Sequence, residues 1–183
     1  MNINQLNNYI RKYSQLTQGI SLFVDMDETL LKYIKNGEIP EGVEGYRLRG
    51  DSVVLKRPGT EQFLMKLKEI GPVYLCTHAN KEYVDDVLDA TGLRKYFDKV
   101  YTREDIWSDD PAILDQRNIG DAILIDNSLM HSSKAMHKMQ WLSVPEDQIP
   151  MHYVQVPEFN GNPDNVFDEV YQKVVEKISV PMS

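Results

Sequence analysis

The sequence predicts an α/β fold, with a Rossmann-like, mainly parallel sheet covered by helices on both faces. Two observations predict it. Short apolar runs of strand length alternate along the chain with longer segments in which apolar residues recur at helical spacing. Three of these runs are followed at once by polar residues, namely Asp25 and Asp27, Thr77 and His78, and Asp126 and Asn127. Since the carboxyl ends of parallel strands lie along one edge of a sheet, we expect these polar residues to meet in one crevice.

Each predicted strand is a short apolar run with a polar or glycine boundary. The first, 20–24, is apolar except for Ser21 and lies between Gly19 and Asp25. Runs of this length and composition are typical of strands buried in a parallel sheet. Further strands are expected at 73–76, 100–101, 122–125 and 151–156.

The predicted helices are bounded by recognisable start and stop signals. Thr60 can cap a helix over 61–70, which ends before Pro72. Pro163 is expected to start the last helix, 163–178, with its apolar residues on one face. Further helices are expected over 81–91, over 129–139 and at the N-terminus (1–18, helical from 4), with a helical turn at 111–117.

Residues 32–55 are expected to form a flap or small β-hairpin between the first strand and the first core helix. They are rich in glycine and charge and contain Pro40. This length is too short for a full cap domain, so the sheet edge is expected to be open. No repeat or long linker interrupts the 183 residues, and we expect one domain over 1–183.

The composition indicates a soluble protein of a reducing compartment. No apolar stretch is long enough to cross a bilayer, and the N-terminus lacks the basic start and apolar core of a secretory signal. The one cysteine, Cys76, lies in an apolar run and cannot form an internal disulfide, which favours a buried thiol. We therefore expect a cytoplasmic protein without a membrane partner.

The overall charge disfavours nucleic acid as a partner. Twenty Lys and Arg residues against 28 Asp and Glu give a formal net charge of −8, which repels polyanions. One window, 47–57, departs from this pattern, with four basic residues against a single acid. Nucleic acid therefore stays open as a partner through this window.

The segment 25–29 reads DMDET and carries the chemistry. Its two carboxylates, Asp25 and Asp27, follow the first strand at a spacing of i, i+2. One carboxylate can act as a nucleophile and the other as a proton donor, and a cation between them would offset their repulsion. The alternative is structural, because Asp and Thr also cap helices and stabilise turns through backbone N–H groups.

Four blocks stand in order along the chain: DMDETL at 25–30, KRPGTEQFL at 56–64, CTHA at 76–79 with the helix after it, and ILIDNS at 123–128. In order and spacing they resemble the haloacid dehalogenase superfamily of phosphotransferases. More narrowly, they resemble the branch of phosphatases that act on the phosphorylated C-terminal tail of RNA polymerase, with their small NLI-interacting-factor-like relatives. The resemblance covers residues 20–140, about two thirds of the chain.

The resemblance implies a role for each matched residue. Asp25 is the nucleophile that forms an aspartyl-phosphate, and Asp27 is the proton donor that later activates water. Thr29 holds the geometry of the turn, and Thr77 binds a phosphate oxygen. The implied cofactor is Mg²⁺, with ligands from the Asp25 carboxylate, the Asp27 main-chain carbonyl, Asn127 and Asp126.

One departure from the family concerns the cation that faces the phosphoryl group. The family places a lysine well before the final Asp126-Asn127 pair, on the turn that opens the preceding helix, where this chain has Asp109-Asp110 and no basic residue. Phosphoryl transfer needs a cation at this position, because charge spreads over three oxygens. The candidate replacements are Arg103, which we favour, Lys134 and Lys81.

Two further residues have two interpretations each. His78 can line the mouth of the pocket, or it can be a loop histidine bonded to local backbone. Arg57 can contact substrate, or it can hold the flap to the sheet, which the adjacent Pro58-Gly59 turn favours.

The leading functional hypothesis is therefore a Mg²⁺-dependent phosphomonoesterase acting through Asp25. An open site suits an accessible phosphate, such as that of a phosphoprotein. The first alternative is a phosphatase for nucleotides or polynucleotide ends. The second is a catalytically silent phosphopeptide-binding or scaffold protein, which the missing lysine motivates.

Overall fold

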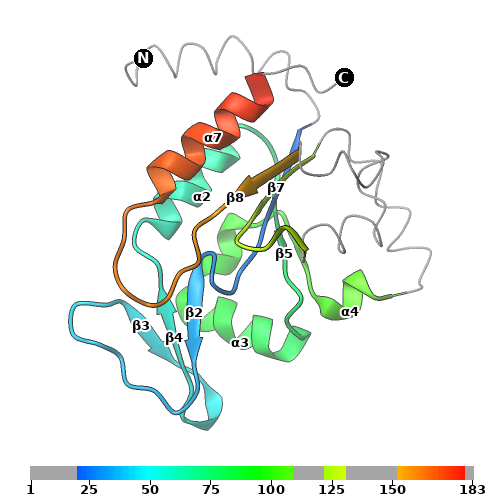
Figure 1. Ribbon diagram of the computed structural model, residues 1–183. Coiled ribbons are helices and arrows are strands. Elements are labelled where there is room, and N and C mark those ends of the chain that lie inside the picture. The colour runs from blue at the N-terminus through cyan, green and yellow to red at the C-terminus, as the bar shows by residue number, and fades with distance from the viewer. Residues whose placement is uncertain (1–19, 109–121, 131–151, 180–183) are drawn as a thin grey trace.

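The computed structural model describes residues 20–108, 122–130 and 152–179. Within them, the chain forms a five-stranded parallel sheet, a smaller antiparallel sheet and helices that pack on the larger sheet (Figure 1). The helices expected at 1–18 and 111–117 and most of the one expected at 129–139 lie outside the described residues.

The central sheet has β1 in the middle, which places the end of this strand beside the ends of two others. Its order is β6-β5-β1-β7-β8, and every pair is parallel. Val24, the last residue of β1, pairs with Leu75 on one side and Ile125 on the other. The strands are β1 (Ser21–Val24), β5 (Val73–Cys76), β6 (Lys99–Tyr101), β7 (Ala122–Asp126) and β8 (Tyr153–Gln155).

Three helices bury their apolar residues with one face of this sheet. They are α2 (Thr60–Lys68), α3 (Lys81–Thr91) and α7 (Phe167–Ser179). Leu22 and Val24 of β1 share a single buried cluster with all three helices. The rings of Phe63 and Phe167 stack at 4.4 Å and join α2 to α7. None of the described helices is long and apolar enough to span a bilayer.

The other face of the sheet is aromatic. Phe23 of β1 lies 5.1 Å from the ring of Tyr74 on β5, and Tyr74 lies 6.1 Å from Tyr101 on β6. Phe23 and Tyr101 are buried, so both faces of β1 are removed from solvent, as in a doubly covered parallel sheet. The predicted α/β class and mainly parallel sheet are confirmed.

The flap contains three antiparallel strands rather than a simple hairpin. They are β2 (Leu31–Ile34), β3 (Gly45–Arg47) and β4 (Val53–Lys56), in the order β2-β4-β3, with a short 3₁₀ turn η1 (Arg49–Asp51) before β4. Val53 and Leu55 of β4 pack with Phe159 in a small core of their own. The flap sheet extends from the end of β1 and lies next to α3 (Figure 1).

The last helix begins later than the sequence predicts. It starts at Phe167, and not at Pro163. The segment before it remains a loop because the Asp164 carboxylate binds the buried Arg57 side chain, 107 residues away in sequence. This long-range ion pair outweighs the local preference of Pro163 for a first helical turn.

Candidate active site

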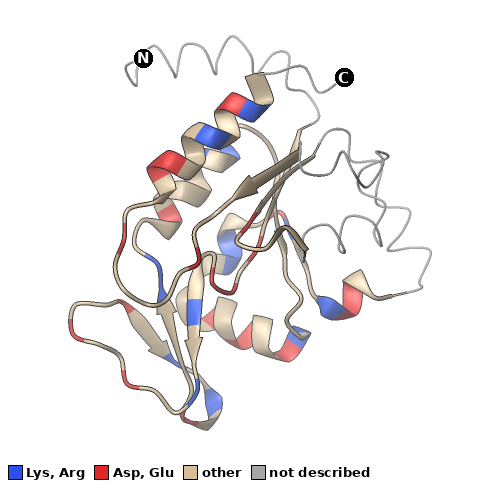
Figure 2. Cartoon of the chain, in the orientation of Figure 1, with Lys and Arg blue, Asp and Glu red and all other residues tan. Residues whose placement is uncertain are grey.

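Asp25 lies directly beyond β1, between the ends of β5 and β7. Its N–H donates to the carbonyl oxygen of Ile125 at 2.9 Å, which continues the ladder between β1 and β7. Burial raises the pKa of its carboxyl well above 3.8, and the nearby charges of Asp126 and Asp27 raise it further. Figure 2 shows acidic segments gathered at this edge of the central sheet.

Asp27 is bound by a tyrosine from the helix that follows β5. The Tyr83 hydroxyl donates to Oδ1 of Asp27 at 2.7 Å. Burial raises the pKa of the Asp27 carboxyl, and the hydrogen bond from Tyr83 opposes this rise. Burial also raises the pKa of Tyr83, with the Asp27 charge adding to the effect, so the phenol keeps its proton and remains the donor of this bond.

Thr29 connects the loop after β1 to the end of β7. Its Oγ1 lies 3.1 Å from Oδ2 of Asp25 and 3.2 Å from Oδ1 of Asn127, and it accepts the Asn127 N–H at 3.1 Å. A hydroxyl has one proton and can donate to only one of these oxygens at a time. Thr29 is fully buried, so these contacts fix Asp25 and Asn127 relative to each other without competition from water.

Thr77 follows β5 and faces the same edge. Its N–H donates to Tyr101 at 3.0 Å, and its Oγ1 accepts the N–H of Ala79 at 3.2 Å. The second bond uses the hydroxyl as an acceptor and leaves its proton to donate to a ligand. His78 lies with its ring 6.4 Å from that of Trp107, which is half-exposed.

Cys76 is partly exposed and is therefore less buried than the sequence predicts. Its sulfur still lies close to the acidic residues. Desolvation, followed by the charges of Asp25 and Asp126, raises the pKa of the thiol well above 9.0. The thiol therefore stays protonated at neutral pH and is a poor nucleophile.

Carboxylate, amide and main-chain oxygens make up the expected metal ligands. Asp126 is buried, and its Oδ1 accepts the N–H of Ser128 at 2.7 Å. The described residues hold no cluster of three or more His, Cys, Asp or Glu side chains suited to a metal. The set fits a hard divalent cation nonetheless, because the buried carboxylates of Asp25 and Asp126 repel each other, and Asn127 adds a neutral oxygen that contacts the same Thr29 hydroxyl as Asp25.

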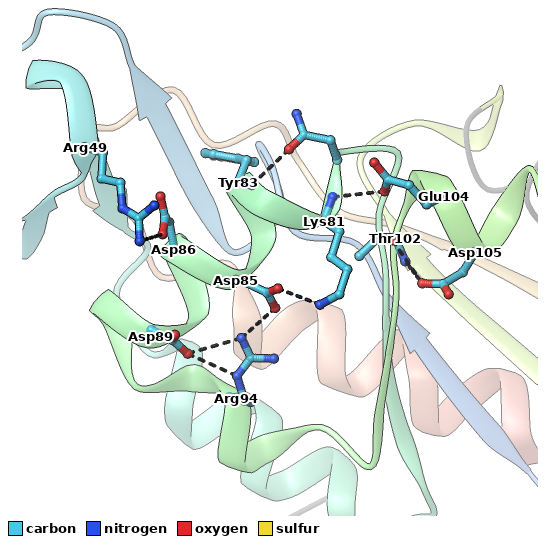
Figure 3. Close-up of polar contacts among 11 residues, drawn as sticks. Arg49, Lys81, Tyr83, Asp85, Asp86, Asp89, Arg94, Thr102, Glu104 and Asp105 are labelled. Atoms are coloured by element: carbon cyan, nitrogen blue, oxygen red, sulfur yellow. Dashed lines mark hydrogen bonds and ion pairs between the residues drawn. The ribbon is translucent and has the colours of Figure 1, made fainter.

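Within the described part of the chain, no candidate for the missing lysine contacts the carboxylates of Asp25 and Asp27. Arg103 begins the short helix α4 (Arg103–Ile106), and its N–H donates to Ala79 at 2.9 Å while its side chain is exposed. The Lys81 ammonium binds Asp85 at 2.6 Å on the outer side of α3 (Figure 3). Lys134 lies outside the described residues, as do Asp109 and Asp110.

Arg57 has the structural role that its neighbouring turn favours. Its side chain is 0% exposed, and it binds Asp164 through two nitrogens, at 2.9 Å from Nε and 2.7 Å from Nη2. Its Nη1 donates to the carbonyls of Thr29 at 3.0 Å and Pro157 at 2.8 Å. The rings of Phe159 and Phe167 lie 5.2 and 5.4 Å from the guanidinium carbon. Arg57 therefore joins the loop after β1 to the segment that contains Pro157 and Asp164, and its side chain is inaccessible to substrate.

Two residues at the site were not assigned a role from the sequence. Tyr83 stands in a block that resembles the family, but the sequence pattern gives no indication that it contacts Asp27, which is 56 positions away. The sequence predicts that Asp164 belongs to the last helix, whereas the structure places it in the loop before Phe167. A buried arginine requires a carboxylate partner, but sequence spacing alone does not say which one.

The fold and this edge of the sheet are those of a parallel α/β protein with buried carboxylates at the ends of its strands, which agrees with the resemblance to the haloacid dehalogenase superfamily. Residues 20–179 match the family model described as NLI interacting factor-like phosphatase. The match covers most of the chain, and the protein belongs to this family.

Of the three relatives described next, one has no functional name and two are named as phosphatases. An uncharacterized protein of Schizosaccharomyces pombe is 30% identical over 75% of this chain and 48% of its own length. Phosphatase PSR1 of Saccharomyces cerevisiae is 27% identical over 69% of this chain and 33% of its own length. The mouse RNA polymerase II C-terminal domain small phosphatase 2 is 26% identical over 84% of this chain and 62% of its own length. The chain therefore spans less than two thirds of each of these relatives.

Solved structures of Fcp1 support the fold. The RNA polymerase II C-terminal domain phosphatase Fcp1 matches with a TM-score of 0.52 and 19% identity, over 96% of this chain and 52% of that one. A fission yeast Fcp1 variant bound to beryllium fluoride also matches with a TM-score of 0.52, at 17% identity, over 95% of this chain and 54% of that one. At these identities, the likeness concerns the architecture of the chain.

Proposed function

We propose that this protein is a Mg²⁺-dependent phosphomonoester hydrolase that works through an aspartyl-phosphate on Asp25. The observation that carries the proposal is the arrangement at the end of β1. There, the buried Asp25 carboxylate contacts Thr29, which also contacts Asn127, and Asp27 follows two residues later. The phosphatase names of the relatives support the same chemistry.

In the first step, an Asp25 carboxylate oxygen attacks phosphorus and the bond to the leaving oxygen breaks. Asp27, as a carboxylic acid, gives its proton to that oxygen, so the product leaves as an alcohol. The raised pKa of Asp27 suits this role, because burial keeps a fraction of the carboxyl protonated at a higher pH than usual. The hydrogen bond from Thr29 to Oδ2 orients the attacking carboxylate.

In the second step, water attacks the phosphorus of the aspartyl-phosphate. Asp27 is now a carboxylate and takes a proton from that water. The bond between phosphorus and the Asp25 oxygen breaks, which releases inorganic phosphate and restores both carboxyl groups. Thr77 has a hydroxyl proton available to hold a phosphoryl oxygen during both steps.

The proposed ligands of the cation are the carboxylates of Asp25 and Asp126, the side-chain oxygen of Asn127 and the main-chain carbonyl of Asp27. A bound Mg²⁺ would neutralise the repulsion between the two carboxylates and the charge that develops on the phosphoryl oxygens. The positively charged side chain that would face the phosphoryl group is proposed to be Arg103, at the start of α4, with Lys134 as the alternative. The Arg103 side chain is exposed and does not contact the carboxylates in this structure, so it would have to turn toward the bound phosphate.

We propose a phosphoprotein as the substrate. The flap contributes only three short strands beside the site, which leaves room for a chain-borne phosphate. In the structure, the basic window 47–57 offers less positive charge for binding nucleic acid than its sequence suggests. Lys56 is 5% exposed and binds Glu44 and Glu61, and Arg57 is buried on Asp164. Arg47 and Arg49 stay exposed, and Arg49 is paired with Asp86 at 3.4 Å.

The test is hydrolysis of p-nitrophenyl phosphate with and without Mg²⁺, by the wild type and by Asp25→Asn. We expect turnover that requires Mg²⁺ and falls at least about 1,000-fold in the variant, because the nucleophile is lost. Circular dichroism of both proteins serves as the control for folding. A folded wild type that binds Mg²⁺ but hydrolyses neither this ester nor phosphopeptides would refute the proposal and favour the scaffold alternative.

A further inference from the structure

The contact between Tyr83 and Asp27 joins α3, which lies next to the flap, to the proposed proton donor. Tyr83 lies in the first turn of α3, which follows β5, so the fold carries this turn to the carboxyl edge of the sheet. Its hydroxyl donates to Oδ1 of Asp27 at 2.7 Å. No role in the reaction has so far been given to this hydroxyl.

The backbone that carries Tyr83 is fixed from three sides. Asn80 caps the helix by accepting the Tyr83 N–H at 2.9 Å. Glu104, in α4, accepts the N–H of Lys81 at 2.9 Å. Arg49 of the flap binds Asp86 one turn along the helix at 3.4 Å (Figure 3). The position of Tyr83 is therefore set by the helix cap, by α4 and by the flap together.

The flap also touches the Tyr83 ring directly. The ring of Tyr33 on β2 meets it edge to face, with centroids 5.5 Å apart and planes at 90°. The Tyr33 hydroxyl is in turn bonded to Ser52 Oγ, just before β4, at 2.8 Å. Edge-to-face aromatic pairs have a preferred geometry, so Tyr33 limits the rotation of the Tyr83 ring.

We propose that Tyr83 is a positioning residue for Asp27 and that Tyr33 of the flap holds Tyr83 in place. The proposal rests on the function given above to Asp27. The terminal torsion of an Asp side chain is broad, so a free carboxyl would sample many orientations. With Oδ1 bound by Tyr83, Oδ2 is the oxygen that faces the leaving group. Proton transfer depends on such alignment, whereas attack by Asp25 does not use this bond.

The proposal predicts a selective loss. The serine oxygen of a phosphoserine peptide is a poor leaving group and needs a proton from Asp27 to leave as an alcohol. The p-nitrophenolate anion is stable and leaves without much help from an acid. Tyr83→Phe keeps the ring and removes the hydroxyl. We expect kcat/KM for a phosphoserine peptide to fall about 10- to 100-fold, and kcat/KM for p-nitrophenyl phosphate to fall less than about 3-fold. The ratio of the two losses is the readout, because kcat/KM covers the first phosphoryl transfer and not the later hydrolysis.

A second variant and a matched control keep the test independent of folding. Tyr33→Ala removes the ring that contacts Tyr83, and we expect the same selectivity at about 3- to 10-fold. Tyr46→Phe removes another flap hydroxyl, one bonded to Glu44 and Lys56, and should leave the ratio unchanged. Thermal unfolding is followed for every variant.

The outcomes separate this proposal from the function on which it rests. A wild type without Mg²⁺-dependent turnover would refute the function itself. If the wild type is active and Tyr83→Phe lowers both substrates equally, or lowers neither, the positioning role is wrong. If Tyr83→Phe is selective and Tyr33→Ala is not, the contribution of the flap is wrong and that of Tyr83 stands.

Discussion

Removing the carboxylate that binds the buried Arg57 is expected to destabilise the fold more than removing an exposed ion pair of the described residues. Arg57 is fully buried, whereas the Asp164 side chain is 30% exposed. Asp164→Asn keeps the shape of the side chain and removes its charge. The Arg57 guanidinium therefore loses its carboxylate partner, while the packing around it is unchanged. Breaking a buried pair costs about 3–5 kcal/mol, and we expect the lower end, about 3 kcal/mol, because water reaches Asp164. In a chain of this size, that loss lowers Tm by about 6–12 °C.

The assay is urea unfolding followed by circular dichroism, with Asp168→Asn as the matched control. Asp168 lies four residues further along the chain, in the first turn of α7, and pairs with Lys66 at 2.8 Å, but the Asp168 and Lys66 side chains are 88% and 45% exposed. We expect the control to lose less than about 0.5 kcal/mol. Equal losses in the two variants would show that the arginine does not depend on Asp164, and the account of the loop between β8 and α7 would be wrong.

Two further predictions concern the site. Thr29→Val leaves the N–H of Asn127 without its acceptor and should cost about 1–3 kcal/mol, with a fall in kcat, measured by urea unfolding and steady-state kinetics. Burial raises the pKa of Asp25 above 3.8, so the metal-free folded state binds this proton more tightly than the unfolded state. Stability relative to Asp25→Asn should therefore fall as the pH rises from about 4 toward neutral, and excess Mg²⁺ should restore it; a constant difference would contradict the shift.

Most of the central sheet could be predicted because its signals are local. The apolar run before Asp25 marks β1, and the runs before Thr77 and Asn127 mark its two neighbours. The alternation of strands and helices then requires a parallel sheet, and a parallel sheet brings the strand ends together. The contacts of Thr29 with Asp25 and Asn127 follow from that topology.

The remaining features could not be predicted because they depend on contacts between distant segments. Lys56 and Arg57 look like part of a basic surface in sequence, yet both are buried on acidic partners. Lys56 binds Glu61, which is close in sequence, whereas the partner of Arg57, Asp164, comes from a distant segment. The start of the last helix depends on Asp164, whose partner is 107 residues away. The position of Tyr83 follows from the packing of α3 beside the flap, which no local pattern encodes.

Trapping the covalent intermediate is the most direct test of the aspartyl-phosphate mechanism. The wild type is mixed with a phosphopeptide and Mg²⁺, quenched in acid within one turnover and digested for mass spectrometry. We expect phosphate on the carboxyl of Asp25, removable by hydroxylamine as an acyl phosphate and absent from Asp25→Asn. Turnover with no phosphate on this residue, or with phosphate on a different side chain, would contradict the mechanism.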